Sequence, residues 1–190
     1  MKQIVLALAA ALGLAACDTA TVPATTPGSF TQASRDVPVM GSVTGFVGGD
    51  QRAWETLDFS VGALDGSAFV TRRDGGEVLT ITGFVAGSGG APEGRIRIVA
   101  GLGGLAPGPG SNVSIILFES AEESGPRLQS TGVPLLNVSN LVRLDEIGGT
   151  AQGTFVATLC RVTDPDAPAD TSDCRDVAGE FDTRVQFDGV

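Results

Sequence analysis

The feature that most constrains the fold is the distribution of apolar residues, which come in short runs ended by Gly, Pro, Asp or Ser. In several runs apolar and polar residues alternate, as at Leu57, Phe59 and Val61, which is typical of a strand with one dry and one wet face. No run keeps the 3.6-residue period of a long amphipathic helix. The sequence therefore predicts an all-β fold.

Turn signals separate these runs. Gly48–Asp50, Asp65-Gly66 and Asp74–Gly76 supply the positive φ that tight hairpin turns require, so consecutive antiparallel pairing is expected. We expect one antiparallel β-sandwich or barrel-like domain of roughly eight to ten strands, with Gly101–Gly110 as a surface loop. The predicted strands are Gly41–Val47, Ala53–Gly62, Ala68–Arg72, Glu77–Ala86, Arg95–Gly101, Asn112–Glu119, Leu141–Leu144, Thr154–Val162 and Arg175–Phe187, with Arg127–Thr131 as a weaker candidate.

Two of these runs indicate the core. Asn112–Phe118 is nearly continuous in apolar character, which predicts a strand covered on both faces. Trp54 is the only Trp, and we expect it to be a core anchor whose indole N–H bonds a carbonyl, with a ligand-stacking platform as the alternative. Alternation predicts inward-facing positions at Ile96 and Ile98 and at Val177, Gly179, Phe181, Thr183, Val185 and Phe187.

The N-terminus has the pattern of an export signal. Lys2 precedes an unbroken apolar run from Ile4 to Ala16, as in the charged and apolar regions of a signal peptide. As a helix at 1.5 Å per residue this run would be about 20 Å long, too short for a hydrocarbon core of about 30 Å. A cleaved signal is therefore expected over residues 1–16.

The end of that run, Leu14-Ala15-Ala16-Cys17, resembles the lipobox of bacterial lipoproteins. The resemblance implies that Leu14, Ala15 and Ala16 are read by the signal peptidase and that Cys17 is lipidated and becomes the new N-terminus. Two or three acyl chains anchor a protein stably. An ordinary secretory signal with Cys17 merely nearby is the alternative. The expected destination is the cell envelope. Asp18 after the lipidated Cys resembles the inner-membrane retention signal of enteric bacteria, a rule that does not extend to other bacteria, so inner and outer membrane both stay open.

Residues 17–36 are rich in Thr, Ala and Pro, a composition that predicts a flexible tether before a domain over residues 37–190. With Cys17 assigned to lipid, Cys160 and Cys174 remain as a pair in an oxidising compartment, and we predict a disulfide between them. The Pro- and Asp-rich segment between them would be a long hairpin loop. The chain-entropy model gives such a bridge about 3 kcal/mol, a structural contribution.

Composition excludes several function classes. The formal net charge is −10, whereas nucleic acid requires a positive surface, so no nucleic-acid partner is expected. The chain contains no His, which excludes Ser-His-Asp and Cys-His catalysis and imidazole zinc sites. The carboxylates of Asp164, Asp166, Asp170 and Asp173 are hard-ion ligands in type, but the pattern favours a solvated acidic loop, and neither metal nor cofactor is expected.

These observations favour a non-catalytic lipoprotein that is held at a membrane through lipid on Cys17 and binds an envelope protein or has a structural role there. The alternative is a lipocalin-like carrier of a small apolar ligand. A carrier requires an enclosed pocket lined by Phe and Leu, whereas a binding module requires an exposed apolar patch or an open strand edge. The sequence identifies no catalytic residue, and the ligand-binding residues stay unassigned.

Overall fold

A computed structural model describes residues 37–59, 66–73, 75–164 and 166–189. Within these ranges the protein is all-β and contains no helix. The signal residues Leu14, Ala15 and Ala16, the lipidation site Cys17 and the tether over 17–36 lie outside the described residues. The strands are β1 Val39–Val47, β2 Asp50–Leu57, β3 Ala68–Arg73, β4 Gly76–Val85, β5 Ile96–Leu102, β6 Gly108–Pro109, β7 Ser111–Phe118, β8 Arg127–Arg143, β9 Gly148–Val162 and β10 Asp170–Asp188.

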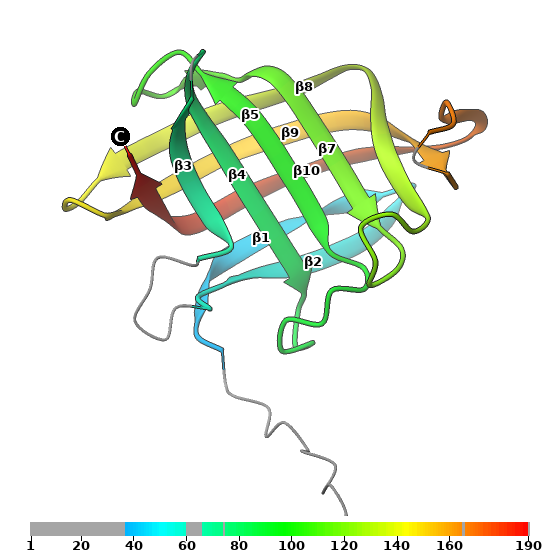
Figure 1. Cartoon of the computed structure of the whole chain (residues 1–190), viewed down its shortest axis with the longest axis horizontal. Helices are drawn as coiled ribbons and strands as arrows, with labels where there is room; N and C mark the ends of the chain where they lie inside the picture. Colours follow the sequence, from blue (N-terminus) through cyan, green and yellow to red (C-terminus); the bar gives the residue numbers. More distant parts are fainter. Residues whose placement is uncertain (1–36, 60–65, 74, 165, 190) are drawn as a thin grey trace, which may run out of the picture. The chain divides into compact units, whose positions relative to one another are not determined.

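The strands form one sheet that closes on itself. Antiparallel pairing runs from β1 through β2, β4, β5, β7, β8, β9 and β10 and returns to β1. The β2–β4 link is short, and β3 fills the adjoining gap by pairing antiparallel with β4 and parallel with β10. In Figure 1, β4, β5 and β7 cross in front of β8, β9 and β10, so the closed sheet is flattened like a sandwich.

The interior of this closed sheet is filled by side chains. The predicted inward row of β10 is confirmed, since Val177, Phe181, Thr183, Val185 and Phe187 are all buried. The predicted inward positions of β5, Ile96 and Ile98, are fully buried as well. They meet Leu79, Ile81 and Ile115 of the neighbouring strands in one apolar core.

Glycines opposite aromatic rings make room for this core. Gly179 of β10 pairs with Phe155 of β9, and a Cβ at Gly179 would lie 2.6 Å from a ring carbon of Phe155. Gly153 of β9 pairs with Phe181 of β10 in the same way, with a separation of 2.5 Å. Each ring therefore lies over a neighbouring glycine, an arrangement that fixes strand register through side-chain packing.

Trp54 is the core anchor that its sequence context predicts. It is buried, and its indole N–H donates to the carbonyl oxygen of Gly94 over 2.8 Å. The predicted turn at Gly48-Gly49 between β1 and β2 is also present, with φ values of 59° and 92°. A residue with a Cβ adopts this left-handed conformation only at a cost, so the two glycines allow the tight connection.

Several strand predictions are wrong in detail. Arg127–Thr131 and Leu141–Leu144 are not separate strands, because β8 runs through both and absorbs register shifts at Thr131/Leu135 and Val138/Asn140. Gly101–Gly110 is not only a loop, since β6 pairs with β8 within it.

Two expectations about burial also fail. Phe59 does not face inward: β2 ends at Leu57, and Phe59 lies partly exposed with its ring edge-on to Phe84. β7 is not covered on both faces, because only Ile115 and Phe118 are buried while the residues between them stay partly exposed. A continuous apolar run in the sequence is therefore compatible both with a strand covered on two faces and with one covered on a single face.

Candidate functional site

The outer face of four adjacent strands carries an apolar row, formed by Phe46 of β1, Ala178 of β10, Val156 of β9 and Leu135 of β8. The strand register places these residues side by side, since Phe46 pairs with Ala178, Ala178 with Val156, and Val156 with Leu135. Strands lie about 4.8 Å apart, so the row extends for about 14 Å across the sheet. All four side chains point away from the core and are exposed.

The large side chains of this row are half or more exposed. The exposed fractions are 54% for Phe46, 51% for Val156 and 63% for Leu135. Val133, which lies in the register shift between Thr131 and Leu135, adds to its end with 86% exposure. Contiguous apolar surface of this kind on a soluble domain marks an interaction site more often than scattered single residues do.

The row lines an open groove of about 620 Å³. Ala178 has the smallest side chain of the row and lies between Phe46 and Val156, so the surface dips at this point. The groove continues past the apolar row to Thr131, Thr158 and Asp176. It is a shallow surface feature, suited to a partner that lies against the sheet.

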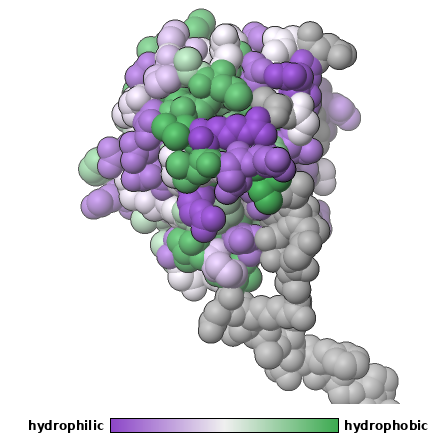
Figure 2. Space-filling view, turned by 90° about the vertical axis from the view of Figure 1, so that its left-hand side faces the viewer, coloured by the Kyte–Doolittle hydropathy of each residue, from purple (hydrophilic) through white to green (hydrophobic). Residues whose placement is uncertain are grey.

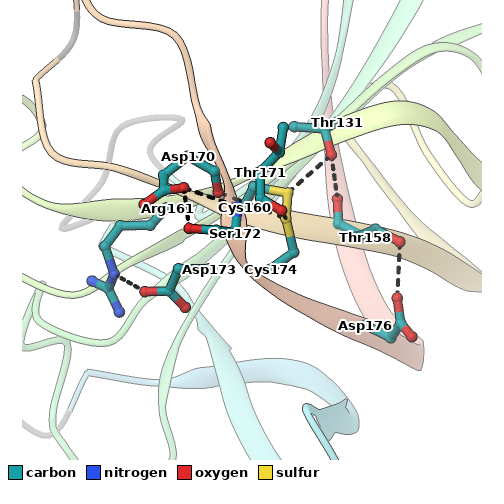
Figure 3. The surroundings of a disulfide bond; sticks show 10 residues. All are labelled: Thr131, Thr158, Cys160, Arg161, Asp170, Thr171, Ser172, Asp173, Cys174 and Asp176. Atoms are coloured by element: carbon teal, nitrogen blue, oxygen red, sulfur yellow. Dashed lines mark hydrogen bonds and ion pairs between the residues drawn. A yellow bond between two sulfur atoms is a disulfide. The ribbon is translucent and has the colours of Figure 1, made fainter.

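A polar row borders the apolar row and connects it to the disulfide (Figure 3). The hydroxyl of Thr158 donates to Asp176 Oδ1 over 2.8 Å. The Thr131 hydroxyl lies 3.3 Å from Cys160 Sγ and donates to the Thr158 carbonyl over 3.4 Å. These contacts link β8, β9 and β10 at the border of the groove.

The predicted disulfide between Cys160 and Cys174 is confirmed. The two residues are direct cross-strand partners of β9 and β10, with 4.0 Å between their Cα atoms. Along β9, Thr158 and then Cys160 follow Val156 at every second position, and Cys160 itself is buried. The bridge lies two such pairs beyond the apolar row. It therefore holds together the two central strands of the groove.

On the other side of the apolar row the surface is polar and acidic. Glu180 pairs with Thr44 of β1 and Thr154 of β9, and the next outward position on β10 is Asp182, which accepts a hydrogen bond of 3.0 Å from Gln152. A second open depression of about 280 Å³ lies here. Asp176, Glu180 and Asp182 thus place three exposed carboxylates beside the apolar row, all on β10.

The carboxylates between the two cysteines mostly bond within their own segment. Asp164 accepts the backbone N–H of Asp166, and Asp170 accepts both the backbone N–H and the hydroxyl of Ser172, which lowers the pKa of Asp170. Asp173 pairs with Arg161 at the base of the hairpin (Figure 3). The described part of the chain holds no group of three or more His, Cys, Asp or Glu arranged for a metal ion.

Arg95 is a buried cation that the sequence did not distinguish from the other arginines. Its guanidinium donates to the carbonyl oxygens of Pro92 over 2.9 Å and Ala121 over 3.1 Å, and lies 4.0 Å from the centre of the Phe118 ring. Burial is the main cause that lowers its pKa. Glu123 contacts both Arg95 and Arg97, and its hydrogen bond from Arg97 is the main cause that lowers the Glu123 pKa. This cluster ties two loops to β5 and has a structural role.

A second exposed apolar area lies at the β8–β9 hairpin, where Val142, Leu144 and Ile147 are exposed. Figure 2 views this end of the domain and shows apolar surface interrupted by polar side chains. The hairpin tip is closed by Asp145, which accepts the backbone N–H groups of Ile147 and Gly148, and these bonds lower the Asp145 pKa. This area has no groove comparable to that of the apolar row among the depressions described above.

The comparisons with known proteins give no family. No protein-family model, curated protein sequence or solved structure matches the chain. Within the described ranges, no helix combines the length and the hydrophobicity that a membrane span needs. Function is therefore inferred from the residues and their geometry.

Proposed function

We propose that the protein is an exported, lipid-anchored bacterial lipoprotein whose β domain binds an envelope partner through the apolar row. The observation that carries the binding role is the row itself: apolar side chains from four strands meet on an outward face beside a groove. The anchor follows from the lipobox resemblance at Cys17. No catalytic constellation enters this function.

The filled interior favours a binding module over a carrier. The inward-facing side chains, among them Phe155, Leu79 and Ile98, pack against one another as a single core. The depressions described above lie on the outer face of the sheet, along the outward residues of β1, β8, β9 and β10. A partner is therefore expected to dock on the outside.

The position of the row suits an anchored protein. The segment that leads from Cys17 joins the domain at the start of β1, whereas Phe46 lies seven residues further along the strand. At about 3.3 Å per residue, the row is separated from the attachment point by roughly 23 Å. The chain therefore enters the β domain at a point away from the row.

The anchor is tested by intact mass and detergent-phase partitioning of the expressed protein beside a Cys17→Ala variant. We expect only the unmutated protein to gain acyl mass and enter the detergent phase. A soluble, unacylated product from both genes would contradict the lipoprotein assignment.

The binding face is tested by site-specific photo-crosslinking in cells. A photoreactive residue at Val133 is expected to give a discrete adduct with a partner. The matched control carries the same residue at Ile147, which is also apolar and exposed but belongs to the hairpin tip. Equal adducts at both positions, or none at Val133, would contradict a partner site at the apolar row.

A further inference from the structure

Beyond the existence of a partner, the charges around the groove define its chemistry. We propose that the apolar row binds a cationic amphipathic segment of a partner protein, with apolar side chains on Phe46, Val156 and Leu135 and with Lys or Arg side chains beside Asp176, Glu180 and Asp182. This inference rests on the proposed binding function and specifies the occupant of the same site.

The first argument is the placement of the carboxylates relative to the dip in the row. Asp176 and Glu180 are the outward neighbours of Ala178 on β10, one on each side. Two residues of a strand span about 7 Å, so each carboxylate lies within reach of a long cationic side chain on a peptide seated over Ala178. Apolar contact and charge contact are available to the same short segment.

The second argument is the lack of compensating cations. Consider the part of the outer face that begins at the cross-strand row of Thr131, Thr158 and Asp176 and ends at the row of Ser42, Asp182 and Gln152. Within it, the described outward residues of β1, β8, β9 and β10 include no Lys or Arg. The side-chain contacts of Asp176 and Asp182 are hydrogen bonds from Thr158 and Gln152, which are neutral. The nearest cations lie at the two ends of this stretch: Arg184 is the next outward residue of β10 beyond Asp182, and Arg175 lines a neighbouring depression together with Asp176. Between them the outward charges of β10 are all negative, which favours the association of a cationic partner and orients it.

The same charges argue against a second copy of this chain as the occupant. Two copies facing each other through the row would bring the carboxylates of β10 on one copy toward those of the other, in a chain that already carries a net charge of −10. Like charges placed opposite each other in an interface are unfavourable. A partner of opposite charge avoids this repulsion and retains the apolar contact.

The inference is tested with three sets of short synthetic peptides of equal length and randomised order, composed of Lys and Leu, of Lys and Ser, or of Glu and Leu. Binding to the mature chain, as isolated from expressing cells, is measured by fluorescence anisotropy at low and high salt. We expect the Lys/Leu set to bind best, with affinity that falls as salt screens the charges.

Two variants and a control locate the binding. Asp176→Asn with Glu180→Gln and Asp182→Asn is expected to weaken the Lys/Leu peptides by about tenfold or more at low salt. Val156→Thr with Leu135→Ser is expected to weaken them similarly without changing the salt dependence. The control, Glu93→Gln with Glu122→Gln and Glu146→Gln, makes the same change in net charge on exposed loops outside the groove and is expected to leave affinity within about twofold.

Each contrary outcome has a defined meaning. Equal losses of affinity in the control variant would show that the peptides sense only net charge. Preferred binding of Glu/Leu peptides, or dimerisation through the row in sedimentation experiments, would assign another occupant to the groove. Each of these outcomes overturns the inference. A position-specific adduct at Val133 in cells together with no Lys/Leu binding would overturn the cationic partner and leave the proposed function standing. Absence of both the Val133 adduct and the Lys/Leu binding would overturn the proposed binding role itself.

Discussion

The pairing of glycine with phenylalanine across β9 and β10 predicts a specific response to one added methyl group. In Gly179→Ala, the new Cβ would lie 2.4 Å from the carbonyl oxygen of Thr44 on β1 and 2.6 Å and 3.0 Å from two ring carbons of Phe155, whereas carbon atoms in contact lie about 3.5–4.0 Å apart. The Phe155 ring and the β1 backbone must therefore both shift, the ring by about 1 Å within a filled core. Overpacking of this kind costs about 1–3 kcal/mol.

An opposing effect acts through the unfolded chain. Replacing Gly by Ala at a compatible position stabilises a protein by about 0.4–1 kcal/mol because the unfolded chain loses freedom. The steric term is larger here, so we expect Gly179→Ala to lower the free energy of unfolding by about 1–2 kcal/mol. At the size of this domain that corresponds to a fall in Tm of roughly 2–8 °C.

Urea unfolding followed by the fluorescence of Trp54, the only Trp, measures this change. Gly103→Ala is the matched control, because a Cβ there has no atom within 4 Å and the backbone φ of Gly103 is not positive. We expect the control to stay within about 0.5 kcal/mol of the parent. In a double-mutant cycle, Phe155→Leu should relieve the part of the clash that comes from the ring but not the part from the Thr44 carbonyl, so that the two changes together destabilise less than their sum by about 0.5–1 kcal/mol. A neutral Gly179→Ala, or strict additivity in the cycle, would refute the reasoning.

Three further predictions concern the elements that support the domain. Arg95→Ala leaves two carbonyl acceptors without their donor and is expected to cost about 2–4 kcal/mol, whereas Arg97→Ala should cost less because Arg97 is partly exposed; equal effects in thermal melts would contradict the structural role of Arg95. Because the Glu123 pKa is lowered in the fold, its stabilisation is present above the ordinary Glu pKa and lost as pH falls through the lowered value. The difference in the free energy of unfolding between the parent and Glu123→Gln should therefore vanish in acid. A difference that does not change with pH would contradict this prediction. Replacing Cys160 and Cys174 by Ser should lower the free energy of unfolding by about 3 kcal/mol. An unchanged urea midpoint would contradict a stabilising role of the disulfide.

The sequence predicted the elements whose signals are local. The alternation over Val177–Phe187 identifies the inward face of β10. The residues between these inward positions, Asp176, Ala178, Glu180 and Asp182, then lie on the outward face. The disulfide could be predicted because the assignment of Cys17 to lipid left Cys160 and Cys174 as one pair. Trp54 was predictable as an anchor because a large amphipathic ring inside a strand needs one polar partner.

What could not be predicted depends on which strands become neighbours. Phe46, Val156 and Leu135 are each unremarkable in sequence, and they form a surface feature only because β1, β9 and β8 flank β10 in a fixed register. One signal was available: Phe155 and Val156 are adjacent apolar residues in an alternating strand, so one of them had to face outward. Arg95 was missed because alternation with Ile96 and Ile98 put it on the water-facing side of the predicted strand Arg95–Gly101, whereas the structure begins β5 at Ile96 and folds Arg95 under the adjoining loops.

The most direct test of the binding role combines the in-cell adduct with a change in the row itself. Cells express the chain with a photoreactive residue at Val133, with or without Leu135→Ser and Val156→Thr, which retain strand-compatible polar side chains. We predict that the adduct disappears in the double variant while the purified variant unfolds at a urea concentration close to that of the parent. An adduct of unchanged yield from the folded double variant would contradict the claim that the apolar row holds the partner.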